Sequence, residues 1–504
     1  MTSRDDIDVV VIGSGMGGAS FAAGLAPSGA RILILERGER LVDRPEARDA
    51  RAIFQRGVFR PQETWFDAAN EAFNPGNYYY VGGNTKLYGG VLIRYRAQDF
   101  APIQYAEGAT PGWPFSYDEI EPWYARAEAL YQVRGRLGED PTEPRHSTSY
   151  AFPPVPDEPA IAAVRERLSR AGMHPFSLPL GVDIDRWLAR AKTPWDAFPD
   201  TNTGKMDAET CGLKTALAYA NVALETGARV IRLETDSAGK RIEAVVYESR
   251  GETRRLAPKL VALAAGAVNS ALLLLASANG AMPRGLANRA DQVGRHFMNH
   301  NSSAALAIDP FKRNDSIYQK TIGLNDFYLD DGRGGPPLGN VQLLGKISGA
   351  ILKSQLRFAP EFALELMARR AVDFYLMSED LPSPESRVRL DGARVMLDWR
   401  PSNMKAQNGL IARMREVLRA AGFPIVLVKP FDRRTPSHQC GTIRMGADAA
   451  KAAVDPHGRA FDHPNLFVVD ASVLPTSAGV NPSLTVAALA LRAAEHVRTT
   501  ELTA

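Results

Sequence analysis

Apolar residues near the start of the chain form two short runs separated by small residues. Val9–Ile12 and the apolar part of Arg31–Leu35 consist of valine, isoleucine and leucine, which is typical of buried strands. Between them, Ala19–Leu25 is rich in alanine and predicts a helix. A strand, a helix and a strand in this order predict a βαβ unit with parallel strands.

A longer apolar stretch, Leu260–Met282, carries no charged residue. It is long enough to cross a bilayer, but Gly266 and several serine and asparagine residues interrupt it. We therefore predict a buried strand at Leu260–Ala265, a turn at Gly266, a buried helix at Ser270–Ala278, and no membrane span.

Amphipathic periodicity and turn residues predict the remaining elements. Ser116 and Glu119 have the spacing of a capping box, which marks the start of a helix. The predicted helices are Glu121–Tyr131, Ile161–Ala171, Lys214–Glu225, Ala359–Arg370 and Met404–Ala421. The predicted strands are Val230–Leu233, Arg241–Glu248 and Leu256–Leu263 in a small sheet, then Val341–Ser348, Ala371–Ser378, Ser386–Leu390 and Ala393–Trp399, the last two joined by a hairpin turn at Asp391-Gly392.

These elements predict an α/β (α+β) protein of two domains, which is reasonable for 504 residues. Residues 1–302 together with 435–504 are expected to form a Rossmann-like nucleotide-binding domain. The segment around residues 115–200 is an excursion from this domain, and its assignment to the first or to the second domain is left open. Residues 303–434 are expected to form that second domain, which has a mostly antiparallel sheet and binds the substrate.

The turn after the first strand has the spacing G-x-G-x-x-G at Gly13, Gly15 and Gly18. In a dinucleotide-binding turn, such glycines allow the tight bend, the approach of a pyrophosphate and close helix packing, and the helix N-terminus attracts the phosphates. Glu36 follows at about the 20-residue distance of the acid that binds a ribose hydroxyl. That acid would repel the 2′-phosphate of NADP, so FAD and NAD remain open, as does a glycine-rich turn in an unrelated α/β protein.

Composition narrows the class of protein. Hydrophobic residues make up 45% and charged residues 23% of the chain, as in ordinary globular proteins, and the net charge is only +3. This balance gives no reason to expect a nucleic-acid partner. The two cysteines, Cys211 and Cys440, and an N-terminus without a signal-peptide pattern predict a cytoplasmic location.

Two further regions contain candidate chemistry. The segment from Gly82 to Gly90 holds four glycines between apolar flanks, so another group is expected to approach its backbone closely. Near the C-terminus, His438 lies in the segment His-Gln-Cys-Gly-Thr. Asn481 and Pro482 predict the N-cap and first residue of a buried helix, whose N-terminus carries a positive partial charge.

These blocks, in this order, resemble the glucose-methanol-choline (GMC) family of flavin oxidoreductases. The resemblance covers the N-terminal glycine turn, the Gly82–Gly90 loop, Gly112-Trp113-Pro114 with Tyr117, the Ala264–Leu274 segment, and His438 with Asn481. It implies FAD as cofactor and His438 and Asn481 as catalytic residues. It implies the following cofactor-binding residues: Gly13, Ser14, Gly15, Met16, Gly17, Gly18, Glu36, Arg37, Gly82, Gly83, Asn84, Thr85, Tyr88, Gly89, Gly90, Val230, Ala265, Gly266, Asp470, Ala471, Pro482 and Ser483.

The chain departs from the family pattern at two positions. Tyr88 stands where the family usually has asparagine beside the flavin ring. Leu87 stands where some members have the histidine that attaches FAD covalently, and the loop has no cysteine either. We therefore expect FAD to be bound non-covalently.

The resemblance implies oxidation of an alcohol. His438 takes the hydroxyl proton as general base, Asn481 holds the substrate oxygen, and hydride passes to flavin N5. Asn481 and the segment Gly294–Asn301 resemble bacterial members that oxidise sugars and glycosides, so a sugar hydroxyl oxidised to a ketone is expected. Alternatives are a sterol or small alcohol, a non-catalytic flavin-binding subunit, and an NAD-dependent dehydrogenase. The electron acceptor is oxygen, a quinone or a redox protein.

The remaining histidines are expected to be structural. His296 and His300 have helical metal-ligand spacing, but no third ligand is evident, so no metal is predicted. His300 is the next candidate for the base if His438 does not fill that role.

Overall fold

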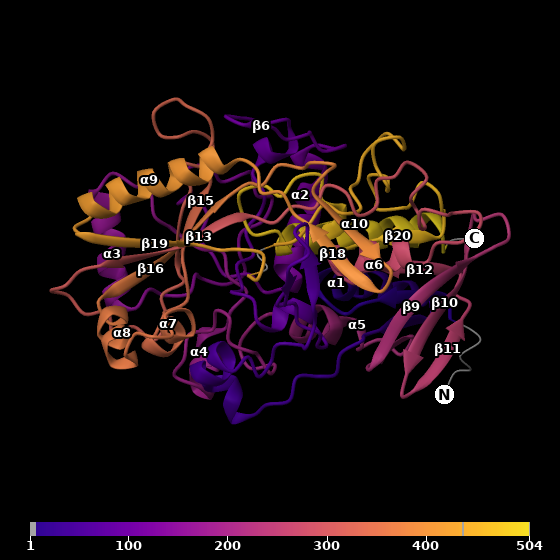
Figure 1. Ribbon diagram of the computed structural model, residues 1–504, viewed down its shortest axis with the longest axis horizontal. Helices are drawn as coiled ribbons and strands as arrows, with labels where there is room; N and C mark the ends of the chain where they lie inside the picture. The colour runs from indigo at the N-terminus through magenta and orange to yellow at the C-terminus, as the bar shows by residue number, and fades with distance from the viewer. Residues whose placement is uncertain (1–6, 436–437, 503–504) are drawn as a thin grey trace.

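The computed structural model describes residues 7–435 and 438–502. It is elongated, and two sheet-containing halves lie along its long axis (Figure 1). The prediction about a signal peptide rests on the N-terminal residues 1–8, of which 1–6 lie outside the described residues. No helix in the described ranges is both long and apolar enough to span a membrane.

The first half is built on a five-stranded parallel sheet with the strand order β20-β12-β1-β2-β8. Helices α1 (Met16–Leu25) and α10 (Ser483–Thr500) pack together beside this sheet, where Gly24 leaves room for Ala494. The predicted βαβ unit is therefore confirmed. The strands are β20 (Leu466–Val468), β12 (Leu260–Leu263), β1 (Val9–Ile12), β2 (Ile32–Leu35) and β8 (Val222–Glu225).

The predicted helix Lys214–Glu225 is wrong. Only α5 (Lys214–Ala216) is helical, after a π-helical turn at Glu209–Leu213, whereas Val222–Glu225 forms strand β8. The amide of Ile32 donates to the carbonyl of Asn221, and the amide of Glu36 donates to that of Glu225. The open edge of β2 thus provides hydrogen bonds that outweigh a weak local preference for helix.

The predicted strand Leu256–Leu263 is two strands of different sheets. β11 (Glu252–Leu256) completes a three-stranded antiparallel sheet with β9 (Ala228–Thr235) and β10 (Ile242–Ser249), whereas β12 belongs to the parallel sheet. Pro258 lies between them and has no amide hydrogen to continue a ladder. Helix α6 (Ala267–Ala276) follows β12, with Gly266 as its N-cap residue.

The second half contains a six-stranded antiparallel sheet, which confirms the predicted fold class. Its order is β19 (Ile425–Pro430), β13 (Asn301–Ile308), β16 (Ala371–Ser378), β15 (Asn340–Leu343), β14 (Ile322–Leu324) and β7 (Phe176–Ser177).

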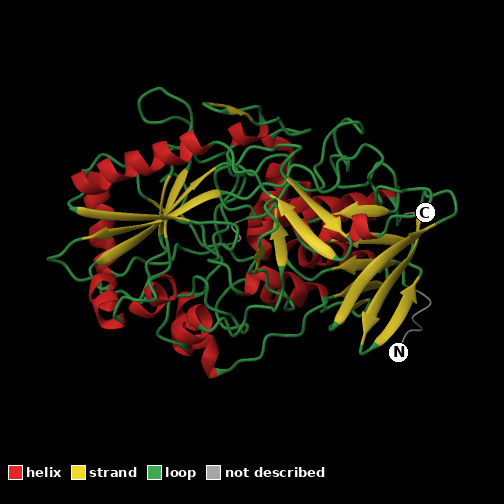
Figure 2. Ribbon diagram, in the orientation of Figure 1, coloured by secondary structure: helices red, strands yellow, loops and turns green. Residues whose placement is uncertain are grey.

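Alternate residues of β13 face opposite sides of this sheet, as the pleat requires. Ala305 and Ala307 pack under α3 (Pro159–Arg170) and α9 (Met404–Ala420). Leu306 and Ile308 pack under α7 (Gly349–Gln355) and α8 (Glu361–Ala368). Helices therefore cover both faces of the sheet, as Figure 2 shows in red around the yellow strands.

Shorter elements lie between and around the two large sheets. Helix α2 (Tyr117–Leu130) begins at the predicted capping box of Ser116 and Glu119. The predicted hairpin of β17 (Arg387–Asp391) and β18 (Arg394–Asp398) pairs with β3 (Trp65–Asp67) and β4 (Ala72–Phe73). The others are α4 (Ile184–Arg190), β5 (Gln104–Tyr105), β6 (Gly108–Ala109), a π-helical turn at Arg51–Gln55 and 3₁₀ turns at Ala26–Ser28, Pro45–Arg48, Gly83–Lys86, Ala97–Phe100 and Ala471–Val473. The division of the chain at residues 303 and 435 stays a prediction.

Candidate active site

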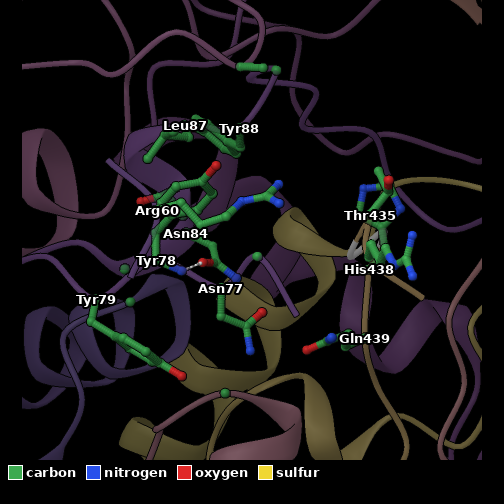
Figure 3. A pocket seen from close by; sticks show the side chains of 18 of the residues that line it. Arg60, Asn77, Tyr78, Tyr79, Asn84, Leu87, Tyr88, Thr435, His438 and Gln439 are labelled. Atoms are coloured by element: carbon green, nitrogen blue, oxygen red, sulfur yellow. Dashed lines mark hydrogen bonds between the residues drawn. The ribbon is translucent and has the colours of Figure 1, made fainter. Parts of the chain in front are cut away.

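One large cavity of about 1480 Å³ extends from the turn between β1 and α1 to the six-stranded sheet. Except for Gly18 and Gly82, every site residue predicted from the sequence lines it. They come from segments far apart in the sequence, as Figure 3 shows for Asn84, Tyr88 and His438. The remaining wall is formed by residues of the second half, including Leu306, Lys320 and Tyr375.

The glycine turn forms one end of the cavity mostly with backbone. A Cβ atom on Gly17 would lie 1.9 Å from the carbonyl oxygen of Val469, and one on Gly18 would lie 2.0 Å from that of Gly13. These two glycines are therefore required by packing inside the protein. A Cβ atom on Gly15 would have no protein atom within 4 Å. The space above Gly15 is thus open to a phosphate group, as the motif predicts.

Glu36 is bound to the same turn. Its carboxylate accepts hydrogen bonds from the amide of Ser14 at 3.0 Å, from Ser14 Oγ at 2.6 Å and from the amide of Gly38 at 2.8 Å. Burial raises the pKa of Glu36 above its usual value. Ser14 Oγ also accepts from the amide of Gly82, at 3.0 Å, which explains how Gly82 supports the site without lining it.

Beyond Glu36, the cavity has a flat aromatic and cationic wall. The guanidinium of Arg37 lies 3.8 Å from the ring centroid of Tyr79, whose hydroxyl donates to Glu63 at 2.7 Å. Val230 also lines the cavity. Such a surface is suited to a planar heterocycle, and Tyr79 is a residue that the sequence did not indicate.

The Gly82–Gly90 loop passes along the cavity. Buried Lys205 fixes it by donating to the carbonyls of Tyr88 at 2.8 Å and of Phe198 at 2.7 Å. The hydroxyl of Tyr88 donates to the carbonyl of Met206 at 2.8 Å, and the Leu87 side chain lines the cavity beside it. Figure 3 shows Leu87 and Tyr88 next to each other on this wall.

His438 and Asn481 meet on the cavity wall. Asn481 Nδ2 donates to His438 Nε2 at 3.2 Å, and Asn481 Oδ1 accepts from Gln342 Nε2 at 2.8 Å. Burial, and after it the electrostatic effects of His300 and Lys320, hold the pKa of His438 well below its usual value of 6.5. The ring is therefore neutral at pH 7, as a general base requires.

The predicted N-cap role of Asn481 is wrong. Helix α10 begins at Ser483 with Pro482 as its N-cap residue, and no side chain caps it. The amide group of Asn481 is occupied by Gln342 and His438 instead. The helix N-terminus still lies at the cavity, because Pro482 and Ser483 line it.

His300 contacts His438 on the side away from Asn481. The two Nδ1 atoms are 2.8 Å apart, and His300 Nε2 lies 2.6 Å from the carbonyl oxygen of Ala478. The segment that contains His296 and His300 is not helical, so these two rings do not share a helix face. Across residues 7–435 and 438–502, no three His, Cys, Asp or Glu side chains are grouped as a metal site requires.

A buried ion pair lies on the wall formed by the second half. Lys320 Nζ lies 3.0 Å from Asp196 Oδ2, which also accepts from the amide of Gly345 at 2.9 Å. Both side chains line the cavity. Nothing in the sequence around Lys320, Asp196 or Gln342 indicated a site, since none of them belongs to a motif.

Comparison with known proteins identifies the family. Family models described as GMC oxidoreductase match residues 195–302 and 382–490, and a model of an NAD(P)-binding Rossmann-like domain matches residues 11–57. A solved structure of pyridoxine 4-oxidase from Mesorbium loti has a TM-score of 0.68 at 20% identity, covers 98% of this chain and all of its own, and so supports the fold.

Two curated relatives are each 30% identical to this chain. The 6'''-hydroxyparomomycin C oxidase of Streptomyces lividus covers 97% of this chain and 91% of its own length. The paromamine 6'-oxidase of Streptomyces fradiae covers 98% of this chain and 92% of its own length. Since this similarity extends over nearly the whole chain and both GMC models match it, the protein belongs to the GMC oxidoreductase family.

Proposed function

We propose that this protein oxidises an alcohol with FAD, with His438 as general base and Asn481 as the residue that holds the substrate oxygen. Family membership implies a flavin and makes an NAD-dependent dehydrogenase untenable. The observation that carries the proposal is the pair of polar atoms, His438 Nε2 and Asn481 Nδ2, 3.2 Å apart on the wall of the large cavity.

The lining of the cavity fits a bound flavin dinucleotide. The open space over Gly15 suits the pyrophosphate, Glu36 is placed for a ribose hydroxyl, and the wall of Arg37 and Tyr79 suits adenine. When bound, the flavin supplies the hydride acceptor for the reaction. The N-terminus of α10 adds a positive partial charge at this end of the cavity.

His438 and Asn481 have different roles in the reaction. A neutral His438 accepts the hydroxyl proton of the alcohol on Nε2, as its lowered pKa allows at pH 7. Asn481 donates a hydrogen bond to the substrate oxygen, which orients the carbon that loses hydride. Gln342 holds the Asn481 amide so that its Nδ2 atom faces the reacting group.

We infer that FAD is bound non-covalently, because Leu87 offers no nucleophile where some family members attach the flavin. Acid precipitation of the purified protein should therefore release all of the yellow colour to the supernatant. Colour that stays with the pellet would show a covalent bond to another residue.

For the substrate, we infer a sugar or an aminoglycoside. Two relatives that are each 30% identical are named for oxidation of the aminoglycosides paromamine and 6'''-hydroxyparomomycin C. The cavity wall also presents Lys320, Asp196 and Tyr375, whose donors and acceptors suit a ligand with several hydroxyl groups.

One anaerobic experiment tests the proposal. The flavin spectrum of purified protein is followed while paromamine, a free sugar, a methyl glycoside, a sterol or a small diol is added, and then oxygen, a quinone or an artificial acceptor. Bleaching by paromamine or a sugar supports the proposed substrate class, and bleaching only by the sterol or the diol replaces it. If no alcohol bleaches a yellow protein, the catalytic proposal fails in favour of a flavin-binding subunit.

A further inference from the structure

The contacts of His300 determine which of its ring nitrogens carries hydrogen. His300 Nε2 lies 2.6 Å from the carbonyl oxygen of Ala478 and 3.0 Å from that of Ser477. A carbonyl oxygen can only accept, so Nε2 must be the donor. Burial lowers the pKa of His300 to about 4, so the ring is neutral and its Nδ1 carries a lone pair.

This state of His300 sets the state of His438. The Nδ1 atoms of the two rings are 2.8 Å apart, and that of His300 can only accept. His438 Nδ1 must therefore carry the hydrogen. Since His438 is also neutral, its Nε2 has the free lone pair, which is directed towards Asn481.

A second chain of hydrogen bonds reaches the same result from the opposite side. It starts at the carboxylate of Asp140, which can only accept and which also pairs with Arg96. Each side-chain amide then donates from its nitrogen to the side-chain oxygen of a neighbouring residue. Because Asp140 can only accept, the placement of nitrogen and oxygen in every amide of the chain is determined. The links are Asn325 Nδ2 to Asp140 Oδ2 at 2.7 Å, Asn340 Nδ2 to Asn325 Oδ1 at 2.7 Å, Gln342 Nε2 to Asn340 Oδ1 at 3.1 Å and Gln342 Nε2 to Asn481 Oδ1 at 2.8 Å.

With its oxygen occupied by Gln342, Asn481 presents Nδ2 to His438 at 3.2 Å. A donor at this position requires a lone pair on His438 Nε2. The two chains share no residue except His438, and both assign the same tautomer to it.

We propose that His300 is a positioning residue that holds His438 in the single tautomer with hydrogen on Nδ1 and a lone pair on Nε2 facing the cavity. A free imidazole has both tautomers available, and only this one can accept a proton from an alcohol at that position. When His438 Nε2 takes the proton, His438 Nδ1–H remains bound to His300, so the ring does not turn away.

The direct test needs no substrate. Protein loaded with FAD and labelled with ¹⁵N-histidine is studied by long-range ¹H–¹⁵N correlation, and the ring of His438 is assigned by its loss in His438→Asn. The proposal requires a protonated Nδ1 and an unprotonated Nε2 for His438 in the wild type. A protonated Nε2 overturns it.

Two variants test the function of the contact, and this part rests on the proposed function. His300→Leu has similar bulk but no acceptor, whereas His300→Asn retains an acceptor close to the position of Nδ1. In His300→Leu, we expect both tautomers of His438 and a flavin reduction rate constant roughly tenfold to hundredfold lower, as for the loss of other partners that orient an imidazole. His300→Asn should recover most of that rate.

The kinetic comparison uses paromamine, or the alcohol of the panel that reduces wild-type protein fastest, and rates are expressed per bound flavin. His463→Asn is the matched control, because His463 is also fully buried and bonded to backbone but lies outside the cavity. It should lower the melting temperature without changing the rate.

Equal rates per bound flavin in wild type and His300→Leu overturn the positioning role. If His300→Leu loses its flavin, the wild-type spectrum and His300→Asn decide the question. If no alcohol reduces the wild-type flavin, the proposed function fails, while the spectrum still tests the tautomer.

Discussion

The two halves of the cavity differ in the part of the chain that they present to a ligand. On the side of the parallel sheet, several glycines expose backbone to the cavity and form what we call the backbone wall: Gly13, Gly15, Gly17, Gly83 and Gly266. On the side of the antiparallel sheet, it consists of side chains such as Lys320, Tyr375 and Leu306.

This difference explains what each half reveals in its sequence. A backbone wall needs glycine at fixed positions, because a Cβ atom on Gly17 would overlap the carbonyl of Val469. A side-chain wall can be built from any residue of a strand that faces the cavity. The cofactor half therefore carries a motif, whereas the substrate half carries none.

The largest effect is expected at the junction of the two halves. His438→Ala should lower the rate constant of flavin reduction by roughly 10²–10⁴, the usual contribution of a general base. Flavin content should stay unchanged, because a backbone wall holds the cofactor. Stopped-flow spectra under anaerobic conditions measure the rate, and Asn481→Ala should lose less. A variant that reduces as fast as wild type would show that the base is another residue of the cavity wall, because both ring nitrogens of His300 are occupied inside the protein.

A pair of glycine variants tests whether the backbone wall recognises the cofactor. Gly15 has φ −69°, which any residue can adopt, and a Cβ atom there meets no protein atom. Gly15→Ala should therefore leave the melting temperature of the apoprotein unchanged but weaken FAD binding roughly tenfold to hundredfold, as an added methyl group in a packed contact does.

Gly17→Ala is the contrasting variant, since its Cβ atom would lie 1.9 Å from the Val469 carbonyl oxygen. It should lower the melting temperature of the apoprotein itself. Calorimetry and flavin titration separate the two effects. Unchanged FAD affinity in Gly15→Ala would show that no phosphate lies over this turn.

Glu36→Ala tests a charged side chain that supports the backbone wall. Loss of hydrogen bonds to a charged acceptor is worth about 1.5–3 kcal/mol, which corresponds to roughly tenfold to hundredfold weaker FAD binding. The rate of flavin reduction per bound flavin should not change. Equilibrium dialysis measures the affinity, and full occupancy in dilute protein would exclude Glu36 as the ribose acid.

The smallest predicted effect is on the pH dependence of flavin reduction, and it is tested at Lys320 on the side-chain wall. Burial, His300 and Lys320 lower the pKa of His438, and the base acts when neutral, so reduction should slow only at a pH well below 6.5. Lys320→Gln removes one positive charge, which should raise this pKa and move the acid limb to higher pH.

The reductive half-reaction is measured across the acid and neutral range. Lys346→Gln is the control, because Lys346 also lines the cavity but is not among the charges that shift the pKa of His438. An acid limb that stays in place in Lys320→Gln would show that Lys320 does not act on the base.

The sequence predicts the parts of the molecule that local patterns determine, and it misses those that depend on contacts between distant residues. The first strand, helix and second strand were predicted because local patterns determine them, and the structure confirms them. Strand β8 was predicted as helix because only its pairing with β2 makes it a strand. Asn481 was predicted as a helix cap because its local sequence fits one, whereas its amide is used by Gln342.

Contacts between distant residues could not be predicted from a single sequence. His300 and His438 are 138 positions apart and meet because the segment before β13 pairs with the segment after His438, where Met298 and Cys440 exchange backbone hydrogen bonds. Gln342 lies in a short strand without a motif, and its importance depends on the register of β15. The catalytic pair could be proposed from sequence, whereas its supporting residues could not.

The two hydrogen-bond chains that meet at His438 also block proton transfer from the base into the protein interior. Amide groups, as in Asn340, Gln342 and Asn481, hold their hydrogens too strongly to pass protons along a chain. The hydrogen on His300 faces carbonyl oxygens, which cannot take it up. In the proposed reaction, a proton taken from the alcohol therefore does not leave along either hydrogen-bond chain, and it departs through the cavity that holds the substrate.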